Sequence, residues 1–128
     1  MAIHADCPGL TVEIYVDGKP LEEYKNPEEK DVPKTATRYV ECRSGAEFAI
    51  KTNFKAPFTP VDTGIIAYLD GTKVHSQIAQ PHEMLTRIYE QVETRWKEYG
   101  QWRASSFLFS DLSFGMQSSF NGRFVAFR

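Results

Sequence analysis

Five side chains in this sequence have the chemistry to bind a metal ion or to pair as nucleophile and base: His4, Cys7, Cys42, His75 and His82. Structural zinc sites usually draw their ligands as two closely spaced pairs. These five residues do not form two such pairs, and a surface or turn position accounts more simply for each histidine. We therefore expect no metal and no cofactor in this protein.

A thiolate–imidazole pair would need Cys42 and His75 on adjacent strands, with the thiol facing a cleft. Cys42 instead falls on the apolar phase of its strand, which is typical of a small core residue. The sequence also lacks a Gly-x-Ser-x-Gly motif, a phosphate-binding loop and a dinucleotide-binding fingerprint. We assign no catalytic residue, and an enzyme is the least favoured class of function.

The aromatic residues Trp96, Tyr99 and Trp102 are the one group with a functional interpretation. On a rigid surface, Trp and Tyr can anchor a partner protein or stack on a sugar ring. The structural alternative is that these rings pack on the body of the protein. Trp102 follows Gly100, so we expect it to be the exposed member of the group.

The element expected to position these rings is an amphipathic helix near residues 82–99. Its apolar residues recur at spacings of three and four, which is typical of one helical stripe: Leu85, Ile88, Tyr89, Val92, Trp96 and Tyr99. Pro81 lies near the predicted start, and Gly100 follows the predicted end. Because no Ser, Thr, Asp or Asn caps the start, a strand through residues 92–96 remains the alternative.

The rest of the sequence predicts β-structure. Residues 37–51 contain two runs of alternating apolar and polar residues, one on each side of Ser44-Gly45. This pattern predicts a hairpin with one solvent-exposed face. Asp17-Gly18 and Asp70-Gly71 are dipeptides that tight hairpin turns prefer. Short strands separated by frequent turns predict a mainly β fold.

We expect residues 1–128 to form a single domain, an antiparallel β-sandwich of seven or eight short strands with the one helix. A chain of 128 residues can bury roughly two thirds of the surface that it exposes when unfolded. The predicted core consists of residues on the apolar phase of their strands: Val40, Cys42, Phe48, Ile50, Leu69 and Val74.

The net charge is −2, and no basic stripe of the kind that follows a phosphate backbone is visible, so nucleic acid is not an expected partner. The N-terminus lacks the basic start and apolar run of a signal peptide. No apolar stretch approaches membrane-spanning length. We expect an intracellular protein, cytoplasmic or nuclear and without a membrane partner, in which Cys7 and Cys42 are free thiols.

Four motifs carry a resemblance to a known family: Thr37-Arg38-Tyr39-Val40-Glu41, Ser44-Gly45-Ala46-Glu47-Phe48-Ala49-Ile50, Tyr68-Leu69-Asp70-Gly71 and Phe107-Leu108-Phe109-Ser110. Together they resemble a widespread fungal domain of unknown function, closely over residues 10–80 and more loosely over residues 102–112. The resemblance implies a β-rich fungal protein and supplies no nucleophile, metal ligand or phosphate-binding residue. Residues 82–99 look more helical here than the strand-like passage that is usual in that family.

These observations predict a non-catalytic, intracellular protein-interaction module of unknown process. The alternative is a carbohydrate-binding β-sandwich that uses Trp96, Tyr99 and Trp102. The expected partner is another protein or a second copy of the chain, bound through a sheet edge. The C-terminal run from Phe120 to Phe127 is either paired within a sheet or available to such a partner.

Overall fold

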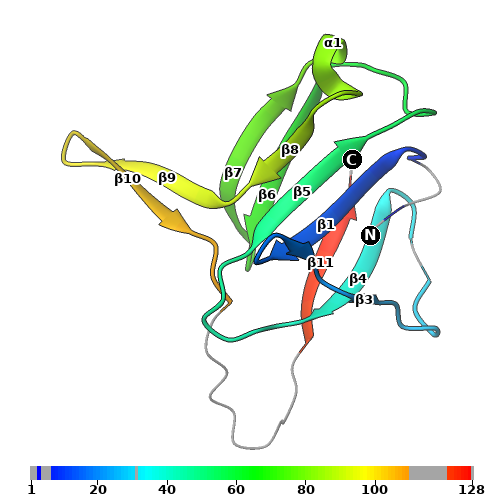
Figure 1. Ribbon diagram of the computed structural model, residues 1–128, viewed down its shortest axis with the longest axis horizontal. Coiled ribbons are helices and arrows are strands. Elements are labelled where there is room, and N and C mark those ends of the chain that lie inside the picture. Colours follow the sequence, from blue (N-terminus) through cyan, green and yellow to red (C-terminus); the bar gives the residue numbers. More distant parts are fainter. Residues whose placement is uncertain (1–2, 4–6, 31, 110–120, 128) are drawn as a thin grey trace, which may run out of the picture.

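The computed structural model describes residue 3, residues 7–30, residues 32–109 and the backbone of residues 121–127. This part of the chain is mainly β (Figure 1), as the sequence predicted. Its strands are β1 (Leu10–Val16), β2 (Lys19–Pro20), β3 (Glu23–Tyr24), β4 (Thr35–Glu41), β5 (Ala49–Phe54), β6 (Thr63–Leu69), β7 (Thr72–Ala79), β8 (Ile88–Gln91), β9 (Glu93–Glu98), β10 (Gln101–Ser106) and β11 (Asn121–Phe127). The one helix among the described residues, α1 (Pro81–Met84), is a single turn.

One layer of the fold is the antiparallel sheet β2-β1-β5-β8. Asp17 and Gly18 join β1 to β2 with φ angles of 53° and 74°, because a type I′ turn needs positive φ at both central residues. Cross-strand partners share one face of a sheet, and the register aligns Val12 with Thr52 and Thr52 with Tyr89. The alternate residues of β1, β5 and β8 therefore present one common face to the core.

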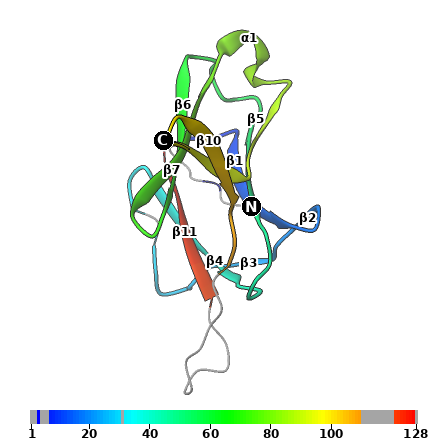
Figure 2. The same ribbon diagram turned by 90° about the vertical axis from the view of Figure 1, so that its left-hand side faces the viewer.

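The opposite layer contains the sheet β11-β4-β3 and the hairpin β6-β7, both antiparallel. Figure 2 shows β6, β7 and β11 on one side of the molecule and β1 and β5 on the other. β6 and β7 meet at Asp70-Gly71, with Leu69 opposite Thr72. Both predicted Asp-Gly hairpins and the predicted antiparallel sandwich are confirmed.

The core lies where the first sheet faces the β6-β7 hairpin. Its buried residues come from both layers and from the connections between them: Cys7, Phe54, Phe58, Ala79, Met84 and Tyr89. The Phe54 ring is central, with its centroid 4.8 Å from that of Phe58 and 5.9 Å, edge to face, from that of Tyr89. Such aromatic pairs add to the stabilisation from burial alone.

The hairpin predicted over residues 37–51 is wrong. A turn forms at Ser44-Gly45, but β4 pairs with β3 and β11, whereas β5 pairs with β1 and β8. The connection therefore crosses from one layer to the other. Its backbone pairs with the segment after β10 instead, where the Phe48 N–H donates to the Phe107 carbonyl at 2.9 Å. Local alternation identified the strands but could not specify their partners, which are distant in sequence.

The helix predicted near residues 82–99 is wrong beyond Met84. No side chain caps the first turn of α1, and the chain then continues as β8 and β9. Tyr89 and Gln91 are buried while Glu90 between them is exposed, which is the two-residue period of a strand. Pairing of β8 with β5 completes the first sheet. The free energy gained from this pairing and from burial of Tyr89 and Gln91 outweighs what a helix with the observed apolar spacing would gain. The strand alternative through residues 92–96 is the correct one.

The predicted core is right for Val40, which is 2% exposed. The other five predicted residues are only partly buried: Cys42, Phe48, Ile50, Leu69 and Val74. The largest fully buried side chains are Tyr89, Phe54, Met84 and Gln91. Three of these four lie in the region predicted as a helix. Because that element was predicted wrongly, its buried residues were missing from the predicted core.

Candidate binding surface

The β9-β10 hairpin, residues 93–106 and hereafter the arm, extends away from the sandwich (Figure 1). Tyr99 and Gly100 form its turn with φ angles of 48° and 78°, the positive values of a type I′ turn. The strands pair along their full length, from Gln101 opposite Glu98 to Ser106 opposite Glu93. A two-stranded hairpin with few other contacts is only marginally stable in water.

All three residues predicted as a contact site lie on the arm, and all three are exposed. The exposed fractions are 42% for Trp96, 95% for Tyr99 and 74% for Trp102. Every residue of β10 is also exposed. The expectation that Trp102 is exposed is therefore confirmed, although Tyr99 at the tip is more exposed still.

The arm does not bring the three rings together on one surface. Trp96 is opposite Arg103, whereas Trp102 is opposite Lys97. Because side chains alternate along a strand and direct partners share a face, Trp96 and Trp102 lie on opposite faces of the arm. Tyr99 occupies the turn between them. The arm therefore presents an aromatic ring on each face and one at its tip.

Ion pairs run along both faces of the arm. Arg103 Nε lies 2.9 Å from Glu98 Oε2 on the Trp96 face, and Arg95 Nη2 lies 2.6 Å from Glu93 Oε1 on the other face. These side chains are largely solvent-exposed, and such surface pairs typically contribute well under 1 kcal/mol. They set the charge pattern that a partner would meet rather than holding the arm in place.

The foot of the arm is anchored by Phe107, a residue that the sequence identified only as part of a family motif. Phe107 is buried, and its backbone N–H donates to the Val92 carbonyl at 2.9 Å. Its ring centroid lies 5.5 Å from that of Phe48, which stacks in turn on Phe109 at 4.6 Å. The alternation of Phe107 and Phe109 with Leu108 and Ser110 was the available signal for this anchor.

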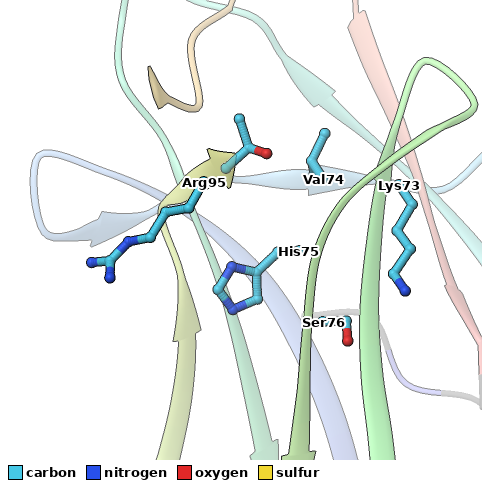
Figure 3. A pocket seen from close by; sticks show the side chains of 6 residues that line it. Lys73, Val74, His75, Ser76 and Arg95 are labelled. Carbon is cyan, nitrogen blue, oxygen red and sulfur yellow. The ribbon is translucent and has the colours of Figure 1, made fainter. Parts of the chain in front are cut away.

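A groove of about 360 Å³ separates the arm from the sandwich (Figure 3). Its lining comes from β7 and from the start of β9: Lys73, Val74, His75, Ser76, Thr94 and Arg95. His75 Nδ1 lies 3.2 Å from the Glu93 carbonyl, which ties β7 to the base of the arm. These residues were not predicted as a site, because the strands that carry them adjoin only in the folded protein.

A β-bulge at Val74 decides which way His75 points. Ala67 is opposite His75 and Tyr68 is opposite Lys73, so Val74 is the extra residue in β7. Ala67 is buried and Tyr68 is exposed, which places His75 on the inner face and Lys73 on the outer face. Without the bulge, Lys73 and His75 would share a face.

The metal ligands considered from sequence do not come together among the described residues. The described residues contain no group of three or more His, Cys, Asp or Glu side chains that could hold a metal ion. Cys7 and Cys42 do not form a disulfide, and the first is buried whereas the second is partly exposed. His4 lies outside the described residues. In the part of the chain that the structure describes, no helix has the length and apolar character needed to span a membrane.

The pKa of one core residue, Tyr89, is raised. Burial raises the pKa of the Tyr89 hydroxyl above its ordinary value, and the nearby Glu83 carboxylate adds to the shift. The Arg87 guanidinium, 5.0 Å from the ring centroid, and the Gln80 backbone oppose the shift only in part. The hydroxyl is buried without a well-formed hydrogen bond to any described residue. This group belongs to the core and not to the arm.

Comparison with known proteins gives a family and no precedent for an activity. No curated protein and no solved structure shows significant similarity to the chain. A family model described as Domain of unknown function (DUF7918) matches residues 9–122. The match takes in the whole first sheet, the β6-β7 hairpin and the arm. The chain therefore belongs to the DUF7918 family of domains of unknown function.

Proposed function

We propose that this domain is a non-catalytic protein-interaction module that binds its partner through the arm. The observation that carries the proposal is the exposure of Tyr99 and Trp102, at 95% and 74%, on a hairpin in which all of β10 is exposed. Exposed Trp and Tyr rings can each anchor a partner protein, because these residue types are enriched at the energetic centres of interfaces.

The energetic basis is burial of these rings. A Trp or Tyr side chain covers roughly 150–250 Å² when buried, and apolar area contributes about 25 cal/mol per Å² removed from water. Trp, Tyr and Arg are also the residues most enriched at the energetic centres of protein interfaces. The arm carries all three types in Trp102, Tyr99 and Arg103.

The backbone of β10 offers a second mode of contact. One edge of β10 pairs with β9, and among the described strands none pairs with its other edge. An open strand edge is a template for a strand of another chain. A partner strand there would extend a marginal two-stranded hairpin into a more stable sheet. The partner is therefore a protein, and a second copy of this chain is the simplest case.

We place the module inside a fungal cell, in the cytoplasm or the nucleus. The fungal setting follows from the motif resemblance of residues 37–50 and 68–71. The intracellular setting is supported by the absence of a disulfide between Cys7 and Cys42, since disulfides are rare in reducing compartments. Neither nucleic acid nor membrane is a partner in this proposal.

Carbohydrate binding is the second candidate, and the exposure of Trp102 favours it. A sugar stacks on a flat aromatic surface, but Trp96 and Trp102 lie on opposite faces of the arm. A single platform of three rings is therefore not available, which weighs against this candidate. Quenching or enhancement of Trp102 fluorescence by soluble oligosaccharides, lost in Trp102→Phe, would instead favour it.

A photoreactive amino acid at position 102 tests the interaction proposal in extracts of native cells, with position 24 as the matched control. Tyr24 is an exposed aromatic residue on β3, outside the arm. We expect the probe at position 102 to crosslink a defined protein or a second copy of the chain. Excess unlabelled wild-type domain should displace that product, whereas the Tyr99→Ala/Trp102→Ala double variant should not. Equal competition by both proteins would contradict the proposal.

A further inference from the structure

The outer edge of β10 lacks the features that usually keep a strand edge from pairing. Native proteins protect such edges with very short strands, lysine, proline or a β-bulge. β2 is protected in this way, since it consists only of Lys19 and Pro20, and β7 carries the bulge at Val74. β10 has six residues and an unbroken register with β9. It contains neither lysine nor proline, and its one charged residue, Arg103, is paired with Glu98.

Three residues of β10 direct their backbone N–H and carbonyl groups to this outer edge. In an antiparallel pair of strands, hydrogen-bonded and non-hydrogen-bonded residue pairs alternate. The Phe107 N–H donates to the Val92 carbonyl at 2.9 Å, so the odd-numbered residues of β10 are the ones that bond to β9. The backbone groups of Trp102, Ala104 and Ser106 therefore point outward, and no backbone hydrogen bond joins them to another described strand or loop.

A second copy of β10 complements this edge in one register. Two identical antiparallel strands are related by a two-fold axis, and one residue lies on that axis because direct partners share a face. With Ala104 on the axis, Ala104 meets its own copy and Trp102 meets Ser106 of the partner subunit. All the outward residues of both strands are then paired, and each pair exchanges both of its N–H···O bonds.

The side chains favour this register over its neighbours. With Ala104 on the axis, Arg103 lies opposite Ser105 of the partner subunit, so that each large side chain meets a small one. With Arg103 on the axis, two guanidinium groups would lie directly opposite each other, which is destabilising. With Ser105 on the axis, Trp102 would lie opposite Leu108, which is beyond the end of β10. Registers that are shifted further pair fewer of the outward residues.

We infer that the domain forms a two-fold symmetric homodimer in which β10 of each copy pairs with β10 of the other, with Ala104 on the axis. The two arms then form one antiparallel sheet in the order β9-β10-β10-β9, which is more stable than an isolated hairpin. Standard interfaces bury about 1,200–2,000 Å²; a single strand edge is smaller, so the dimer dissociates on dilution. This dimer rests on the proposed function, since it names the partner of the arm.

Single cysteines on β10 test the register, in a Cys42→Ser background that leaves only the buried Cys7. Ala104→Cys should form a disulfide-linked dimer on mild oxidation, because Cα atoms in a hydrogen-bonded pair lie about 5.5 Å apart and a disulfide spans about 4.4–6.8 Å. Ser106→Cys is the matched control on the same face. Its own copy would lie four residues away, or about 13 Å along the strand, so it should remain a thiol. Intact mass distinguishes the two results.

Sedimentation equilibrium tests the association without a crosslink. The wild-type domain should show a monomer–dimer equilibrium, and Ala104→Pro should shift it to monomer because proline removes an outward N–H that β9 does not use. Ala104→Thr keeps that N–H and should dimerise like wild type. Circular dichroism should show the same fold and thermal midpoint for both variants at a concentration where wild type is monomeric.

Three results would each overturn the homodimer: a wild-type domain that is monomeric at about 1 mM, a dimer that Ala104→Pro leaves unchanged, or crosslinking at position 106 in place of position 104. If the domain is monomeric while the probe at position 102 captures a different protein, the homodimer is wrong and the proposed function stands. Equal competition by wild type and by the Tyr99→Ala/Trp102→Ala variant in that crosslinking assay contradicts the proposed function itself, so the two failures are distinguishable.

Discussion

Trp96 and Trp102 lie on opposite faces of the same two-stranded arm, because Trp96 is opposite Arg103 and Trp102 is opposite Lys97. Six positions apart in sequence, the two residues would share a face on a single continuous strand. The turn at Tyr99-Gly100 reverses the chain and changes the phase. A partner that wraps around the arm can bury both rings, whereas a flat ligand contacts only one.

The two tryptophans should therefore report different environments. In Trp96→Phe, the emission of Trp102 should be strongly quenched by acrylamide, because this ring is 74% exposed. In Trp102→Phe, the emission of Trp96 should be quenched less, since that ring is 42% exposed. Stern–Volmer constants measured on the two single-tryptophan variants check this order, and the reverse order would contradict the exposures of the two rings.

Phe54→Ala should be among the most destabilising single substitutions in the core. The ring is 1% exposed and contacts both Phe58 and Tyr89, and loss of a buried phenyl ring costs about 3–5 kcal/mol. Phe48→Ala should cost less, because Phe48 is only partly buried. Urea unfolding followed by circular dichroism gives both free energies of unfolding. An equal or larger loss for Phe48→Ala would mean that the ring stack at the foot of the arm is the true core.

Gly9→Ala should destabilise the protein by several kcal/mol. A Cβ at this position would lie 2.0 Å from the Lys55 carbonyl oxygen, and Gly9 has a φ of +87°. The Lys55 N–H also donates to the Gly9 carbonyl at 2.8 Å, so the two segments cannot separate without losing a hydrogen bond.

Gly64→Ala is the matched control for that substitution. Nothing lies within 4 Å of the position that its Cβ would take, and Gly64 sits within β6. Glycine inside a strand is less stable than alanine by roughly 0.5–1 kcal/mol, so Gly64→Ala should be neutral or slightly stabilising in the same urea experiment. A large loss for Gly64→Ala would contradict the open outer face of β6.

The stability of the protein should fall at alkaline pH partly because of Tyr89. Burial raises the pKa of its hydroxyl in the folded state, so the unfolded chain releases this proton at a lower pH than the folded protein does. The contribution of the Tyr89 hydroxyl to stability is complete below the pKa of about 10 that a tyrosine has in the unfolded chain. It is lost as the pH rises from that value through the pKa of Tyr89 in the folded protein.

Tyr89→Phe isolates this contribution. The variant should be as stable as wild type or slightly more stable at pH 7, since it removes a buried hydroxyl that lacks a well-formed hydrogen bond. Its free energy of unfolding should decline less than that of wild type above about pH 10. Parallel pH profiles for the two proteins would show that Tyr89 does not titrate with unfolding.

The two thiols should react at different rates in the folded protein. Cys42 is partly exposed, whereas Cys7 is buried in the core beside Phe54 and Phe58. Ellman's reagent should modify Cys42 first and Cys7 only as the protein unfolds, with both thiols titrating in denaturant. A mass two daltons below that of the reduced chain would instead indicate a disulfide.

The sequence by itself determined the local features of this protein. Asp17-Gly18 and Asp70-Gly71 specified their hairpins because a tight turn depends on the few residues within it, and Pro20 limited β2 to a short edge strand. The mainly β character followed in the same way from alternation and turn spacing. Exposure of Trp102 was also predictable, since it lies just beyond Gly100.

Tertiary structure decided which strands pair and what residues 82–99 become. Leu85, Ile88, Val92 and Trp96 are spaced as on a helix, yet all are exposed by about 40–60%. Tyr89 and Gln91 are buried instead because β8 aligns with Thr52 and Ile50 of β5. That pairing joins residues about forty positions apart, and the contact of Phe48 with Phe107 joins residues that are still further apart in sequence. Periodicity within one segment cannot specify such partners, because the free energy of pairing is gained only when strands that are distant in sequence form contacts.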